Sequence, residues 1–245
     1  EKTMNILVVG ANGAIGQAVI EAFREQYSSA VVYAVSRGTY AGNETGAKRK
    51  QVVPVQLDTV NETAITNWLS ACKAKGTAFT HAVIATGVLH DDYVTPEKRL
   101  EDVSAEAMQH YFLVNTIGPS LWVKLLVGHL AQGGSTVSVL SARVGSISDN
   151  RLGGWYGYRA SKAALNMFVK TASVEYARRA KHTSLICYHP GTVDSSLSKP
   201  FQRNVKPGKL FTPAYTAAQL LAVIEQANTS ESPYFIDWAG KSIPW

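Results

Sequence analysis

In Ile6-Leu7-Val8-Val9-Gly10-Ala11-Asn12-Gly13-Ala14-Ile15-Gly16, four consecutive apolar residues lead directly into a turn with three glycines. A continuous apolar run of this kind is typical of a strand that is buried on both faces. Strand, glycine turn and helix in this order are the context that a phosphate-binding turn requires. The helix is predicted because apolar residues recur at helical spacing, at Ile15, Ala18, Val19, Ala22 and Phe23.

Each glycine of this turn has an expected role. Gly10 permits the tight turn, Gly13 lets a ligand approach the backbone, and Gly16 lets the helix pack closely on the sheet. The free N–H groups at the helix N-terminus would then bind a pyrophosphate. The residues predicted to contact a dinucleotide here are Gly10, Asn12, Gly13, Ala14, Ile15 and Gly16. The alternative is an ordinary strand-to-helix turn.

The end of the second strand indicates which dinucleotide is preferred. The apolar run Val31-Val32-Tyr33-Ala34-Val35 ends in Ser36-Arg37. A free ribose 2′-hydroxyl is usually held by an Asp or Glu about 20 residues beyond the glycines, and this chain has no acid there. The planar fork of Arg37 suits a phosphate instead, and Ser36 adds a hydroxyl. The sequence therefore predicts NADP(H) rather than NAD(H); the alternative is a solvated surface arginine.

A tyrosine and a lysine later in the chain form a candidate pair for proton transfer. Tyr158 and Lys162 are four residues apart in a helical pattern, so they share one helix face. A phenol normally has a pKa of about 10, and a neighbouring ammonium favours the phenolate. We therefore expect the pKa of Tyr158 to be lowered toward neutral. Tyr156 could compete, but only Tyr158 stands four residues before a lysine. The alternative is a chance pair on an exposed helix face.

Composition excludes several classes of protein. The 245 residues are 46% hydrophobic and 17% charged, which indicates a globular protein with a substantial core. No apolar run reaches a membrane span of about 18 residues, and no signal peptide is visible. The two cysteines suggest neither a disulfide framework nor a metal site, so we expect a cytoplasmic protein without a metal. The net charge of +6 is scattered, apart from clusters such as Lys48-Arg49-Lys50, so no nucleic-acid or membrane partner is expected.

Strand and helix patterns alternate along the chain. Strands are predicted at 52–57, 81–85, 136–140, 184–188 and 234–236, and helices at 61–75, 104–130 and 157–179, with a last helix from 212–213. This alternation predicts an α/β fold, a doubly wound parallel sheet of the Rossmann type in three αβα layers, as a single domain over residues 1–245. Residues 194–211 contain two prolines and several serines and are predicted to form a mobile lid.

Three further motifs connect the chain with a known family. They are Asn115-Thr116-Ile117-Gly118-Pro119, Tyr158-Arg159-Ala160-Ser161-Lys162-Ala163-Ala164-Leu165-Asn166 and His189-Pro190-Gly191-Thr192-Val193. In this order and spacing, the chain resembles the short-chain dehydrogenases/reductases over nearly its full length. Its ending, from Asp237-Trp238-Ala239-Gly240-Lys241 to Pro244-Trp245, is similar to the C-factor-like, or sniffer-like, carbonyl reductases of that family.

The resemblance implies roles for individual residues. Tyr158 would be the general acid toward a carbonyl oxygen, Lys162 would lower its pKa and hold the nicotinamide ribose, and Asn115 would position a water in the proton relay. The other cofactor contacts would be Asp58 at the adenine, Gly87 after the fourth strand, and Pro190, Gly191, Val193 and Ser195 around the nicotinamide.

The resemblance also implies a homodimer or homotetramer. The family commonly associates through the two helices that are predicted here at 104–130 and 157–179. Apolar positions in these helices would serve either such an interface or simply the core: Phe112, Trp122, Leu126, Leu165, Phe168 and Val169.

The glycine turn departs from the family pattern. Val9 stands where the family usually has a threonine, and the second glycine of the family falls on Ala14, with Gly13 one place early. After the fourth strand, Ala85-Thr86-Gly87 replaces the usual Asn-Ala-Gly.

The substrate-orienting serine is the largest departure. In the family it stands three residues before a glycine, and relative to Gly145 that position is Ala142. Ser141 lies one residue earlier, and Ser146 is a second candidate. Because a one-residue step along a strand turns a side chain to the other face, both candidates stay open at this point.

The expected function is an NADP(H)-dependent oxidoreductase that interconverts a carbonyl and an alcohol on a small substrate. Tyr158, Lys162, Asn115 and Ser141 are its predicted catalytic residues. The alternative is a dinucleotide-binding signalling or regulatory protein with weak or vestigial turnover, which the altered glycine turn and Ala142 would favour.

Overall fold

Parallel strands form the central sheet in the order β3-β2-β1-β4-β5-β6-β9. The computed structural model describes residues 3–42 and 51–245, so the predicted basic cluster at Lys48–Lys50 lies outside the described residues. The strands are β1 (Asn5–Val9), β2 (Val31–Ser36), β3 (Val52–Gln56), β4 (Phe79–Ile84), β5 (Ser135–Leu140), β6 (Thr183–His189) and β9 (Tyr234–Asp237). This order confirms the predicted doubly wound sheet.

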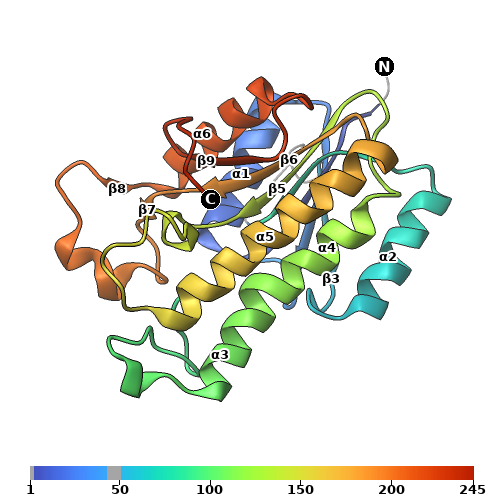
Figure 1. The fold of residues 1–245 in the computed structure, drawn as a ribbon. Helices are drawn as coiled ribbons and strands as arrows, with labels where there is room; N and C mark the ends of the chain where they lie inside the picture. The colour runs from blue at the N-terminus through green and yellow to red at the C-terminus, as the bar shows by residue number, and fades with distance from the viewer. Residues whose placement is uncertain (1–2, 43–50) are drawn as a thin grey trace.

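Helices cover both faces of the sheet (Figure 1). One hydrophobic cluster packs α2 (Glu62–Ala74), α4 (Gly118–Leu126) and α5 (Tyr156–Arg179) against one face. A second cluster packs α1 (Ala14–Gln26) and α6 (Pro213–Gln226) against the other. The three predicted αβα layers are therefore confirmed. The central strands β1, β4, β5 and β6 are largely buried on both faces, as their apolar runs require, whereas the edge strand β3 is mostly exposed.

The helix predicted at 104–130 is interrupted, and that boundary prediction is wrong. The chain forms α3 (Ala105–Phe112), a π-helical turn η3 (Leu113–Ile117) and then α4. Pro119 has no N–H to donate to the carbonyl of Asn115, four residues earlier. The Gly118 N–H instead bonds the carbonyl of Leu113, five residues earlier, which is the π pattern. The break therefore falls at Asn115.

The structure shows which of the apolar residues on the predicted long helices belong to the core. Trp122, Leu126, Leu165 and Val169 are buried in the cluster under α4 and α5. Phe112 is half-buried and Phe168 is exposed on the outer face of these helices. The core interpretation thus holds for four of the six.

The segment predicted as a lid contains regular structure. Its first part follows β7 (Thr192–Val193) and includes a short helix, η5 (Lys199–Asn204). Its last part is β8 (Leu210–Phe211), which pairs in parallel with β7. Within residues 3–42 and 51–245, no helix is long and apolar enough to cross a membrane.

Candidate active site

A cavity of about 440 Å³ opens at the carboxyl ends of β1, β4, β5 and β6. In open parallel sheets, ligands bind at this edge, where the strand order reverses. Many of the residues predicted from sequence meet there: Gly13, Ala14, Ile15, Gly87, Ser141, Tyr158, Lys162, Pro190, Gly191, Val193 and Ser195.

The glycine turn forms one end of the cavity. Gly10 has a φ of +84°, and a Cβ added to Gly16 would lie 2.1 Å from the Gly10 carbonyl oxygen. Gly13 is the N-cap of α1 and has no side chain to bond the first N–H groups, and this fully described helix has no acid in its first turn. The first N–H groups of α1 are therefore left without a side-chain partner, which is the arrangement that suits an anion.

Asn12 and the strand-end residues lie beyond the cavity wall. The Asn12 Nδ2 donates to the carbonyl of Thr39 (2.9 Å), and its Oδ1 accepts from the Ala41 N–H (2.8 Å). Asn12 therefore ties the loop after β2 to the glycine turn. This loop carries Arg37, which is exposed.

Ser36 and Asp58 lie at the ends of neighbouring strands. The buried Ser36 hydroxyl donates to the carbonyl of Gly38 at 2.8 Å, so it shapes the loop that carries Arg37. Asp58 follows β3, and its exposed carboxylate accepts from the Val60 N–H at 3.1 Å. These two residues and Arg37 do not line the cavity but border the same edge of the sheet.

Tyr158 and Lys162 both line the cavity from the first turns of α5. The Lys162 Nζ lies 5.8 Å from the centre of the Tyr158 ring and donates to the carbonyl of Leu140 at 2.9 Å. The predicted lowering of the Tyr158 pKa is wrong for this structure, because burial of the phenol raises its pKa to about 12. Burial also lowers the pKa of Lys162 to about 8. Tyr156 does not line the cavity.

Asn115 lies directly beneath these residues and is fully buried. Its Oδ1 accepts from the Val88 N–H (2.7 Å), and its Nδ2 donates to the Val88 carbonyl (2.9 Å) and to the Ser161 Oγ (3.1 Å). A Cβ on Gly87 would lie 3.3 Å from the Lys162 Nζ and 3.5 Å from the Asn115 Oδ1. Asn115 thus fixes the loop after β4 against α5.

The two candidate serines lie in different surroundings. Ser141 lines the cavity, and its hydroxyl donates to the Asn166 Oδ1 at 2.6 Å. The buried Ser146 does not line the cavity; its Oγ accepts from the Asp149 N–H at 3.1 Å. Ala142, at the family position, also faces the cavity.

Several cavity residues were not predicted from sequence, among them Trp155, His189 and Phe201. Trp155 stands three residues before Tyr158, so its helical spacing was a usable signal. Phe201 comes from η5, and its contribution depends on where that segment folds. His189 ends β6, and burial lowers its pKa to about 4, so it is neutral at pH 7. Its Nδ1 is buried without a hydrogen-bond partner among the described atoms.

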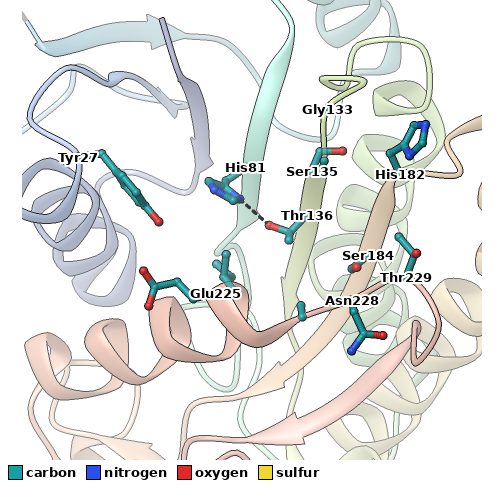
Figure 2. Close-up of a pocket in the computed structure, with 13 residues that line it drawn as sticks. Tyr27, His81, Gly133, Ser135, Thr136, His182, Ser184, Glu225, Asn228 and Thr229 are labelled. Atoms are coloured by element: carbon teal, nitrogen blue, oxygen red, sulfur yellow. Dashed lines mark hydrogen bonds between the residues drawn. The ribbon is translucent and has the colours of Figure 1, made fainter. Parts of the chain in front are cut away.

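A second cavity, of about 670 Å³, lies at the opposite edge of the sheet (Figure 2). His81 of β4 and Thr136 of β5 point into it and share a hydrogen bond of 2.8 Å. Tyr27 and Glu225 border it from the ends of α1 and α6. Because it lies at the amino ends of β4, β5 and β6, none of the predicted site residues reaches it.

A family model described as short chain dehydrogenase matches residues 4–206. The chain belongs to the short-chain dehydrogenase family. The resemblance that the sequence motifs indicated is therefore confirmed.

This short-chain dehydrogenase is also similar to individual known proteins. It is 33% identical over 147 residues to the C-signal of Myxococcus xanthus, which covers 60% of this chain and 83% of that protein. The carbonyl reductase Sniffer of D. melanogaster has a similar structure, with a TM-score of 0.82, 18% identity, and coverage of 99% and 100%. A carbonyl reductase from Pseudomonas aeruginosa PAO1 in complex with NADP has a TM-score of 0.79, 24% identity, and coverage of 100% of both chains.

Proposed function

We propose that this short-chain dehydrogenase uses NADP(H) to interconvert a carbonyl and an alcohol on a small substrate. The observation that carries the proposal is the cavity itself. A hydroxyl and an ammonium, from Tyr158 and Lys162, face the space into which the N-terminus of α1 opens. A proton donor and an anion site in one cleft are what carbonyl reduction by a dinucleotide requires.

The residues present fit a dinucleotide. The N-terminus of α1 offers free N–H groups to a pyrophosphate, and the absence of a side chain on Gly87 leaves room beside Lys162 and Asn115. Arg37 offers a planar fork to a 2′-phosphate at the end of β2. The similar P. aeruginosa reductase was solved with NADP. We therefore propose NADP(H) as the cofactor, with Ser36 and Asp58 bordering its adenosine half.

The protein residues would divide the remaining chemistry. When bound, the cofactor supplies or accepts the hydride at its nicotinamide ring. Because the pKa of Tyr158 is about 12, its hydroxyl keeps its proton at neutral pH and can donate that proton to a carbonyl oxygen. The Lys162 Nζ, 5.8 Å from the centre of the Tyr158 ring, would stabilise the phenolate that proton donation leaves. This assignment favours reduction over oxidation near pH 7.

Asn115 and Ser141 would support this chemistry. The Asn115 side chain holds the loop after β4 in place. Because Pro119 has no N–H, the backbone carbonyl of Asn115 lacks the usual α-helical donor and can accept a hydrogen bond from the proposed relay water. The Ser141 hydroxyl would orient the carbonyl after exchanging its bond to Asn166 for one to the substrate. Removal of one such donor commonly costs about 10²–10³ in rate, so Ala142 is consistent with a slow enzyme rather than an inactive one.

The regulatory alternative has less support. Loss of the residues around the cleft would favour it. Instead, Tyr158 and Lys162 both line the cleft, and Asn115 bonds Ser161 in the same helix. A spectrophotometric screen of ketones, aldehydes and quinones with NADPH separates the two. We expect NADPH oxidation with some carbonyl compounds; tight NADPH binding without turnover of any would support the regulatory protein.

We also propose a homo-oligomer through the outer face of α4 and α5. Large apolar side chains are exposed there on η3 and α5: Leu113, Ile117, Met167, Phe168 and Val174. Apolar side chains gathered on one face mark an interaction site more often than scattered ones do. Light scattering should give a dimer or tetramer, and Met167→Glu should shift it toward the monomer; a monomeric wild-type protein would refute the interface.

A further inference from the structure

The backbone before α5 is held in an unusual conformation. Gly153, Gly154 and Trp155 have φ values of 64°, 67° and 54°. Trp155 is the only non-glycine residue with a positive φ among those the structure describes. A bulky side chain disfavours this left-handed region, and such outliers persist only where the surroundings hold them. The position of Trp155, in the wall of the active-site cavity, points to a role there.

Glu97, from the loop after β4, holds this conformation. The Trp155 N–H donates to the Glu97 carbonyl at 2.6 Å, and the Gly157 N–H donates to the Glu97 Oε2 at 2.7 Å. The carboxylate is buried at the N-terminus of α5, where the helix dipole favours a negative charge. Arg159 adds bonds to the carbonyls of Gly154 (2.8 Å) and Gly153 (3.0 Å). The turn is therefore fixed on both sides.

The fixed turn places the indole ring between two other rings. The Trp155 and Tyr158 ring centres are 6.0 Å apart with the planes at 80°, and the Trp155 and Phe201 centres are 5.4 Å apart at 68°. Phe201 contacts His90 edge-to-face at 5.5 Å, and the His90 Nε2 lies 3.1 Å from the Ser196 carbonyl oxygen. The aromatic wall thus joins the catalytic tyrosine to the 194–211 segment.

The rest of the cavity is lined by apolar side chains and by uncharged polar ones. The apolar side chains are those of Val88, Leu89, Val144 and Leu197, and the hydroxyls include those of Thr86, Ser141 and Thr192. Of the described residues that line the cavity, Lys162 alone has a formally charged side chain, and its Nζ already bonds the Leu140 carbonyl. A substrate carboxylate beside Tyr158 would therefore meet no unbonded cationic side chain among these lining residues to offset its desolvation. A flat ring would instead meet aromatic edges and faces in their preferred arrangement.

We propose that Trp155 is a specificity-determining residue and forms, with Phe201, an aromatic slot beside Tyr158 that selects uncharged aryl ketones and aldehydes. The slot rests on the proposed function, since it names the substrate class of the same site. Glu97 is the positioning residue of the slot, because it bonds the backbone on both sides of the indole.

Three dicarbonyl compounds test the slot with NADPH. 1-Phenyl-1,2-propanedione carries a ring, 2,3-hexanedione replaces the ring with an alkyl chain, and phenylglyoxylate keeps the ring but adds a carboxylate. We expect the wild-type kcat/KM for the first to exceed the other two by about tenfold or more. Trp155→Leu and Phe201→Leu should each remove most of this preference, and Trp155→Phe should retain it. A wild-type preference for the aliphatic or charged compound, or a preference that both leucine variants keep, would overturn the slot.

Binding of compounds that cannot be reduced separates the slot from the proposed function. Calorimetry with benzamide and isobutyramide, with and without NADPH, should show tighter binding of benzamide to the wild type and no such difference for Trp155→Leu. This result would support the slot even if no carbonyl compound were turned over, and only the proposed function would then fail. Equal binding of the two amides by the wild type would overturn the slot whatever the turnover. The NADPH affinity of each variant, expected within about twofold of wild type, controls for folding.

Discussion

Two glycines of the turn after β1 have different physical roles, and two alanine substitutions separate them. A Cβ on Gly16 would lie 2.1 Å from the Gly10 carbonyl oxygen, about 1.3 Å closer than the 3.4 Å at which ordinary contact begins. The obstacle is backbone, so α1 must move away from β1. We expect Gly16→Ala to lower the free energy of unfolding by about 1–3 kcal/mol, the usual cost of overpacking.

Gly13 provides the matched control. It has a φ of −71°, which alanine adopts easily, and its Cβ would meet the Gly10 oxygen at an ordinary 3.4 Å. Alanine lowers the entropy of the unfolded chain, which stabilises the fold, but it is a poorer N-cap than glycine, which destabilises it. Because these two effects nearly cancel, Gly13→Ala should change the free energy of unfolding by about 0.5 kcal/mol or less. Because Gly13 lines the cleft, the methyl group of an alanine at this position should nevertheless weaken NADPH binding by about tenfold, or about 1.4 kcal/mol.

Urea unfolding and NADPH titration of the two variants measure both quantities. The expected result is a large loss of stability for Gly16→Ala alone and a loss of NADPH affinity for Gly13→Ala without unfolding. If Gly16→Ala unfolds at the same urea concentration as Gly13→Ala, the close approach of α1 to the turn is not what Gly16 provides, and the reasoning is refuted.

Other expectations concern Arg37, the pH dependence and Glu97. Arg37→Glu should weaken NADPH binding by about tenfold or more and leave NADH binding nearly unchanged; equal effects in parallel titrations would refute the 2′-phosphate contact. Because the pKa of Tyr158 is raised to about 12, the phenol is protonated below that pH, so alcohol oxidation should keep rising from pH 7 to 10; a plateau by pH 8 in a kcat profile would indicate a lowered pKa instead. Because Lys162 loses its proton above about pH 8, reduction should decline there. Glu97→Ala leaves the Gly157 N–H unpaired and should cost about 1–3 kcal/mol in urea unfolding, whereas Glu97→Gln, which keeps an acceptor oxygen, should stay near wild type; equal losses would mean that this hydrogen bond is not what matters.

Features with local causes were predictable from the sequence. The turn between β1 and α1 follows from glycine chemistry and apolar periodicity. The helix caps were equally local: Ser104 and Thr212 each accept the N–H three residues ahead, from Ala107 and Tyr215. These signals depend on neighbours in the chain, which a sequence displays directly.

Features that depend on tertiary surroundings were missed or misjudged. The π turn inserts one extra residue into the helix, and Pro119 was the local signal of a break at Asn115. The sequence showed the ammonium beside Tyr158 but not the burial that outweighs it and raises the phenol pKa. Glu97 lies sixty positions from Gly157, and nothing in its local sequence indicates that it caps α5. Long-range contacts of this kind decide the shape of the substrate site.

The central claim is that Tyr158 delivers the proton in a reaction driven by bound NADPH. The most direct measurement compares the turnover and the NADPH affinity of Tyr158→Phe with those of Tyr156→Phe. Tyr156 is the control because its side chain does not line the cleft. The account predicts that Tyr158→Phe loses about 10²–10⁴ in turnover while binding NADPH as the wild type does, and that Tyr156→Phe stays active. A Tyr158→Phe enzyme that retains most of its activity would contradict it.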